Sequence, residues 1–122
     1  MCNLGRCYEH GNGIDVDIQK AFELYQKAAG LGYLNGINKL GCCYDSGNGA
    51  DVNKQKAFKL FQKAAKLGND CAQYNLALMY EDGDGTKKNM DQAIYWFKKS
   101  AEQGDKDAQN KLKNILKSES YN

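Results

Sequence analysis

Hydrophobic residues recur along this chain at the spacing of one helical face. The clearest stripe has apolar side chains at i, i+4, i+7 and i+8, namely Ala72, Leu76, Met79 and Tyr80. A second stripe follows at Ala93, Trp96, Phe97, Ser100 and Ala101. Spacings of three and four residues are typical of an amphipathic α-helix that packs on one side. No segment alternates between apolar and polar residues with period two, so the pattern predicts an all-α protein.

The chain repeats itself every 36 residues. Residues 4–36 match residues 40–72 at 20 of 33 positions, and residues 40–72 match residues 76–108 at 11 of 33, both without a gap. Each repeat carries two helical stripes, and such a helix-turn-helix unit buries its apolar face only by stacking on its neighbours. We therefore expect a single domain over 1–122 with seven helices. Its repeats lie at about 1–35, 36–71 and 72–107, followed by a capping helix at 108–117 and a mobile tail at 118–122.

Glycine, asparagine and aspartate mark the expected helix ends. Gly83 and Gly104 end the two helices of the third repeat, because glycine adopts the left-handed C-terminal conformation without Cβ strain. Asn89 is placed to cap the second helix of that repeat. Asp17 and Asn53 hold the equivalent positions in the first and second repeats.

The repeat columns resemble the Sel-one-like repeat family, a relative of the tetratricopeptide repeats. That family places Ala, Leu-Gly and Tyr on the first helix, followed by a Gly-x-Gly loop, Asp-x-x-Lys-Ala, an aromatic pair, Ala-Ala and a closing Gly. The second repeat supplies Leu40, Gly41, Tyr44, Gly47, Gly49, Asn53, Lys56, Ala57, Leu60, Phe61, Ala64, Ala65 and Gly68. The third supplies Ala72, Leu76, Ala77, Tyr80, Gly83, Gly85, Asn89, Ala93, Trp96, Phe97, Ser100, Ala101 and Gly104. The departures are Leu24 and Leu60 at an aromatic position, Gln92 for Lys and Ser100 for Ala.

This resemblance covers nearly the whole chain and implies a right-handed α-α superhelix, or solenoid. It implies a scaffold or adaptor that binds proteins or peptides and has no catalytic activity of its own. Members of the family often carry such repeats beside other domains, including kinases. The alternative is therefore a repeat fragment of a larger signalling protein with an intramolecular or oligomerising structural role.

Candidate partner-binding residues lie on the first helix of each repeat, which lines the concave face in tetratricopeptide-like folds. They form a stripe outside the core columns: Arg6, Glu9, Asn38, Cys42, Asp45, Tyr74, Leu78, Glu81, Asn110 and Asn114. We expect an apolar groove centre at Tyr74, Leu78 and Cys42. The amides of Asn38 and Asn110 flank this centre as clamps for a peptide backbone.

Acidic residues line one edge of this predicted groove and favour a partner that carries Lys or Arg. Two alternatives stay open. Tyr74 and Leu78 could pack on the next first helix as core residues, and the acidic edge could consist of solvated helix ends.

The charge balance is weak, because 17 basic residues face 15 acidic ones and the net charge is +2. With no continuous basic stripe evident from the sequence, we expect no nucleic-acid partner. No apolar run reaches the ~20 residues that a membrane helix needs, and no signal peptide is recognisable. The five cysteines include no Cys-x-x-Cys pair, and Cys7 and Cys43 fall in one core column. These features favour reduced structural thiols and a cytoplasmic location.

The sequence offers no catalytic, metal or cofactor site. His10 is the only histidine, so no cluster with two histidines can form. Asp82, Asp84 and Gly85 resemble the start of a calcium loop, but Ala93 stands where that loop needs a glutamate. No nucleophile has a neighbouring histidine and an orienting carboxylate. The first repeat begins inside its own first helix, so Leu4, Cys7 and Tyr8 would leave an open apolar edge suited to self-association.

Overall fold

The structure, a computed structural model, describes residues 15–120. Six α-helices cover most of this range, and it contains no strand. The helices are α2 (Asp15–Gly30), α3 (Leu34–Ser46), α4 (Lys54–Lys66), α5 (Asp70–Asp82), α6 (Met90–Glu102) and α7 (Lys106–Ser120). The prediction of an all-α solenoid of helix-turn-helix repeats is confirmed. The first of the seven predicted helices lies outside the described residues.

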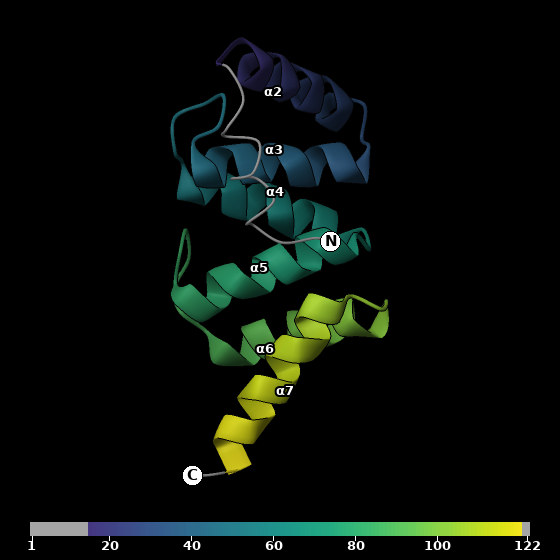
Figure 1. The fold of residues 1–122 in the computed structure, drawn as a ribbon, viewed down its shortest axis with the longest axis vertical. Coiled ribbons are helices and arrows are strands. Elements are labelled where there is room, and N and C mark those ends of the chain that lie inside the picture. Colours follow the sequence, from purple (N-terminus) through teal and green to yellow (C-terminus); the bar gives the residue numbers. More distant parts are fainter. Residues whose placement is uncertain (1–14, 121–122) are drawn as a thin grey trace.

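The helices stack in chain order along the long axis of the molecule (Figure 1), from α2 at one end to α7 at the other. The main contacts join each helix to its neighbour in the chain, from α2 with α3 to α6 with α7. α3 and α4 form the second repeat, and α5 and α6 form the third. This arrangement is that of a solenoid, in which each unit buries its apolar face against the units before and after it.

Equivalent residues of successive repeats fill the core. Phe61 and Phe97 are 36 residues apart and both are fully buried. Phe61 lies in a cluster built from α3, α4 and α5, which includes Ile37 and Leu76. Phe97 lies in the next cluster along the stack, with Ala108 of α7. The same column therefore anchors two neighbouring layers of the core.

Small residues let the helices approach each other closely. A Cβ added at Gly36 on α3 would lie 2.5 Å from the Cβ of Ala28 on α2, so no larger residue fits there without movement. Ser100 replaces the alanine of its column and is completely buried. Its hydroxyl donates a hydrogen bond of 2.9 Å to the carbonyl oxygen of Asp70, which satisfies the buried polar group.

The observed helix ends of the second and third repeats agree with the sequence, whereas those of α2 and α7 differ. The side chains of Asn53 and Asn89 accept hydrogen bonds from the backbone N–H groups of Lys56 and Gln92, so both predicted caps are confirmed. Gly83 ends α5 in the left-handed conformation, with φ of 74°. The prediction that Asp17 caps its helix is wrong, because α2 already begins at Asp15.

α7 resembles a first helix whose outward side has become polar. Its Ala108 is buried like Ala72 of α5, which shows that the inward column is kept. Asn110 and Lys113 are exposed, whereas their equivalents Tyr74 and Ala77 are buried. α7 begins at Lys106 and continues to Ser120, so it is longer than the predicted 108–117, and residues 118–120 of the expected tail are helical.

Candidate functional site

The structure separates the predicted partner-binding residues by their exposure. Asn38, Cys42, Asp45 and Tyr74 are buried, Leu78 and Glu81 are half-buried, and Asn110 and Asn114 are exposed. Arg6 and Glu9 lie outside the described residues. The exposed part of the predicted stripe is thus concentrated on α5 and α7, at the C-terminal end of the stack.

Tyr74 packs into the core between α5, α6 and α7. Its side chain is 8% exposed, and its ring centroid lies 5.7 Å from that of Phe97. Burial, together with the carboxylates of Asp107, Asp105 and Glu81, raises the pKa of Tyr74 to about 12. This environment agrees with the packing alternative stated from the sequence, and little of the ring is left for a partner.

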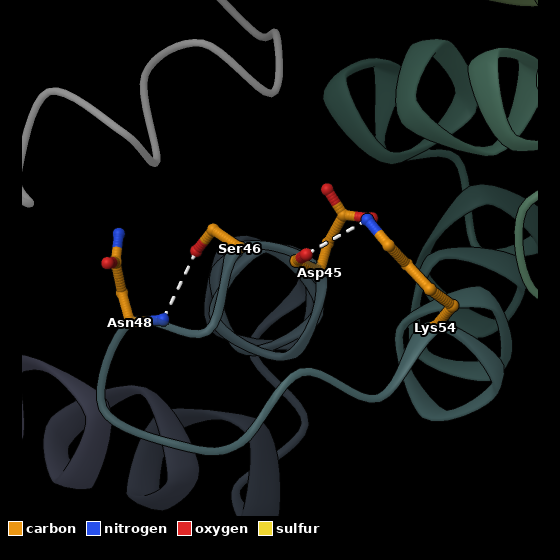
Figure 2. Close-up of polar contacts among 4 residues, drawn as sticks. All are labelled: Asp45, Ser46, Asn48 and Lys54. Atoms are coloured by element: carbon orange, nitrogen blue, oxygen red, sulfur yellow. Dashed lines mark hydrogen bonds and ion pairs between the residues drawn. The ribbon is translucent and has the colours of Figure 1, made fainter.

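Two of the predicted acidic residues already have basic partners within the chain. Lys54, at the start of α4, donates a hydrogen bond of 2.8 Å to Oδ1 of Asp45 and one of 3.0 Å to its carbonyl oxygen (Figure 2). Lys111 of α7 lies 2.7 Å from Oε1 of Glu81. The first pair ties the end of α3 to the start of α4, and the second ties α5 to α7. These carboxylates are therefore partly neutralised.

Asp82 keeps an exposed carboxylate at the C-terminal end of α5. Its pKa is raised, first by partial burial and then by the neighbouring carboxylates of Glu81 and Asp84, while Lys111 and Lys88 act in the opposite direction. The helix dipole adds further negative potential at this end. A cationic group would be stabilised here.

Side-chain amides connect the first helices of successive repeats. Nδ2 of Asn75 on α5 donates to Oδ1 of Asn38 on α3 at 2.9 Å, and Nδ2 of Asn69 donates to Oδ1 of Asn35 at 3.0 Å. Oδ1 of Asn75 is buried and has no hydrogen-bond partner within residues 15–120. No pattern in the sequence singles out Asn75, because its column holds lysine at positions 39 and 111.

The cysteines differ from one another in their chemistry. Cys43 is buried, as expected of its soft apolar column, and Cys42, predicted at the groove centre, is buried as well. Cys71 is disulfide-bonded, so the expectation of reduced thiols is wrong for this residue.

The described residues hold no group of three or more histidine, cysteine, aspartate or glutamate side chains that could bind a metal ion. Over the same part of the chain, no helix is both long enough and apolar enough to span a membrane.

Comparisons with known proteins agree with the repeat architecture. The model of the Sel1 repeat matches residues 1–33, 34–69 and 72–105, so three successive copies cover most of the chain. No curated protein matches the chain.

Solved structures from three bacteria are similar. A protective antigen of uropathogenic Escherichia coli with an SLR fold shares 37% identity over 89% of this chain, with a TM-score of 0.76. A Sel1 repeat protein of Oxalobacter formigenes shares 34% over 90%, with a TM-score of 0.74. Cysteine-rich protein B of Helicobacter pylori shares 32% over 77%, with a TM-score of 0.71. The chain spans 23%, 44% and 71% of these proteins, respectively.

Proposed function

The chain belongs to the Sel1 repeat family, and on this basis we propose that it is a protein- or peptide-binding adaptor that uses the exposed surface of its first helices. Proteins with these repeats are typically scaffolds for protein–protein interaction, and the fold is generally non-catalytic. We assign the chain no catalytic step of its own.

The observation that carries the proposal is the mixed surface at the α5–α7 end. Leu78 is a half-buried apolar side chain on α5, and the exposed amides of Asn110 and Asn114 follow on α7. An apolar contact flanked by amides suits an extended backbone, because each amide offers both hydrogen-bond donors and an acceptor. Tyr74 lies in the core cluster against which Leu78 packs, and Cys42 is buried in the neighbouring cluster that contains Phe61.

We propose that the partner presents a basic side chain beside Leu78. Asp82 is the exposed carboxylate nearest in sequence to Leu78 on α5, and its pKa is raised first by partial burial and then by repulsion from Glu81 and Asp84. A Lys or Arg of the partner would relieve this repulsion. The preference for a basic partner thus rests on Asp82 rather than on the ion-paired Asp45 and Glu81.

Affinity capture with the purified chain tests the proposal. We expect the double variant Leu78→Asn, Asn114→Ala to lose its specific partner, with capture reduced about tenfold, because a few residues carry most of an interface's binding energy. Bound proteins would be identified and quantified by mass spectrometry. Tyr74 is left unchanged, since truncating a buried ring would destabilise the fold itself.

The matched control is Val52→Asn, which makes the same kind of apolar-to-polar change elsewhere. Val52 is 57% exposed and lies in the α3–α4 turn. Circular dichroism would first establish that all variants fold. Equal capture by the wild type and the double variant, or an equal loss in the control, would rule out the first-helix surface as the binding site.

A further inference from the structure

The second helices carry a repeated stripe of lysine and leucine. In the first repeat the stripe comprises Lys20, Leu24 and Lys27 on α2 and Leu31 directly after its end, spaced four, three and four residues apart. In the second repeat the equivalent residues are Lys56, Leu60 and Lys63 on α4 and Leu67 at its C-cap. This spacing places the three helical residues on one side of each helix, and the last leucine closes the stripe at the helix end. Two successive repeats therefore present the same alternation of cationic and apolar groups.

The leucines of this stripe are unusually exposed. Leu24, Leu31 and Leu67 are 65%, 71% and 60% exposed, whereas Leu60 is half-buried and packs on the core cluster that contains Phe22. Leu67 belongs to the second repeat, which has described repeat helices on both sides, so its exposure does not come from a position at the end of the stack. Apolar groups that cluster on an exposed face are characteristic of interaction surfaces.

The lysines of the stripe are equally accessible. Lys20, Lys27, Lys56 and Lys63 are all exposed. α4 contains no acidic residue, so lysines are its only charged side chains. On α2, Glu23 is the one acidic side chain among residues 18–30. The stripe thus combines positive charge with exposed apolar area, although the whole chain carries a net charge of only +2.

We propose that this Lys–Leu surface of α2 and α4 binds an acidic amphipathic helix of a partner protein. Such a helix places carboxylates and large apolar side chains at spacings of three and four residues, which matches the spacing of the stripe. Its carboxylates would face Lys27 and Lys63, and its apolar side chains would cover Leu31 and Leu67. The surface lies on the second helices and is therefore separate from the proposed binding surface on α5 and α7.

A protein helix explains this surface better than a nucleic acid does. The described residues contain no arginine, the residue best suited to bidentate phosphate contacts. Phosphates would also leave the exposed leucines uncovered, and the exposed Glu23 on α2 would repel them. An anionic membrane surface could use both lysine and leucine, and the experiment therefore includes it as a competing outcome.

Fluorescence anisotropy tests the proposal with a fluorescein-labelled synthetic helix of Glu, Leu, Phe and Ala that carries Glu and Leu at spacings of three and four residues. We expect saturable binding to the full chain. Two double variants should each weaken this binding by about tenfold or more. The first carries Lys27→Glu with Lys63→Glu, and the second carries Leu31→Ser with Leu67→Ser. A peptide with the same glutamates but serine at every apolar position should bind far more weakly.

Two control variants make the same chemical changes elsewhere. The first is the double variant of Lys87→Glu with Lys88→Glu, which makes the same charge change in the exposed α5–α6 turn. The second combines Val52→Ser with Leu116→Ser, which removes exposed apolar groups from the α3–α4 turn and from α7. Neither should change the affinity by more than about twofold, and thermal melting should show that every variant folds. Absence of binding, equal losses in the controls, or binding to phosphatidylserine vesicles in place of the peptide would each overturn the proposal.

Discussion

Single polar side chains determine where the helices of this protein begin. Asn69 precedes α5 and accepts a hydrogen bond of 2.8 Å from the backbone N–H of Ala72. Asp105 holds the same column before α7 and accepts one of 3.0 Å from Ala108. Each satisfies a backbone donor that the helix cannot satisfy internally. Both residues are also buried, so their chemistry affects the stability of the fold.

We predict that Asp105→Ala destabilises the protein by about 1 kcal/mol, because it removes the cap of α7. Asp105→Asn should be at least as stable as the wild type at pH 7. It keeps the capping oxygen, as Asn69 does, and removes a buried charge. Urea denaturation of the three proteins would measure the free energies of unfolding. An equal loss in both variants would show that the charge, and not the cap, is what α7 requires.

The advantage of Asp105→Asn should depend on pH. Burial raises the pKa of Asp105 above 3.8, with a further contribution from Asp107, so the folded state holds this proton more tightly than the unfolded state. The resulting stabilisation is complete below pH 3.8 and is lost as the pH rises through the folded-state pKa. The stability difference between the variant and the wild type should therefore shrink as the pH falls from 7 towards 4. A constant difference over this range would contradict the assigned cause.

At the scale of the secondary-structure elements, the turns between helices differ in how closely they pack against the rest of the protein. The α5–α6 turn passes close to the start of α4, where a Cβ at Gly85 would clash with the carbonyl oxygen of Lys54. The backbone of Gly85 also has a positive φ of 71°. The α6–α7 turn is different, because Gly104 has φ of 97° but open space around it.

We predict that Gly85→Ala destabilises the protein by roughly 3 kcal/mol, the sum of left-handed backbone strain and overpacking against α4. Gly104→Ala is the matched control and should cost only about 1 kcal/mol, since it suffers the backbone strain alone. Thermal and urea denaturation would give both values. Similar costs for the two variants would mean that the turn moves away from Lys54 without penalty.

At the scale of the whole molecule, stability is shared between neighbouring helices. The principal contacts join helices that follow one another in the chain. In such a one-dimensional stack, a defect weakens the units that touch it more than distant ones. The centre and the end of the stack should therefore respond differently to the loss of an apolar side chain.

We predict that Phe61→Ala costs roughly 3 to 5 kcal/mol and increases amide hydrogen exchange in α3, α4 and α5, which share its core cluster. Leu112→Ala removes a half-buried side chain of α7 and should cost less. Its effect on exchange should be confined to α5, α6 and α7, which form the cluster against which Leu112 packs. Faster exchange in α2 after Leu112→Ala would show that the stack unfolds as one cooperative unit instead.

The sequence alone determined the described helices, their order and the core columns that recur in each repeat. Phe61 and Phe97 could be identified as core residues because helical spacing is local and the column recurs 36 residues later. The caps at Asn53 and Asn89 were predictable for the same reason, since a cap acts within three residues of itself. Asp17 was assigned from its column alone, and α2 instead begins two residues earlier.

Only the tertiary structure decided how much of each polar or apolar group remains available to a partner. Tyr74 was a groove candidate in the sequence, but the packing of α6 and α7 buries it. Glu81 is ion-paired with Lys111, which lies 30 residues further along the chain. The exposure of Leu31 and Leu67 likewise depends on how the repeats stack. Repeat columns specify which side of a helix faces inward, whereas the tilt and separation of neighbouring helices determine which side chains meet across repeats.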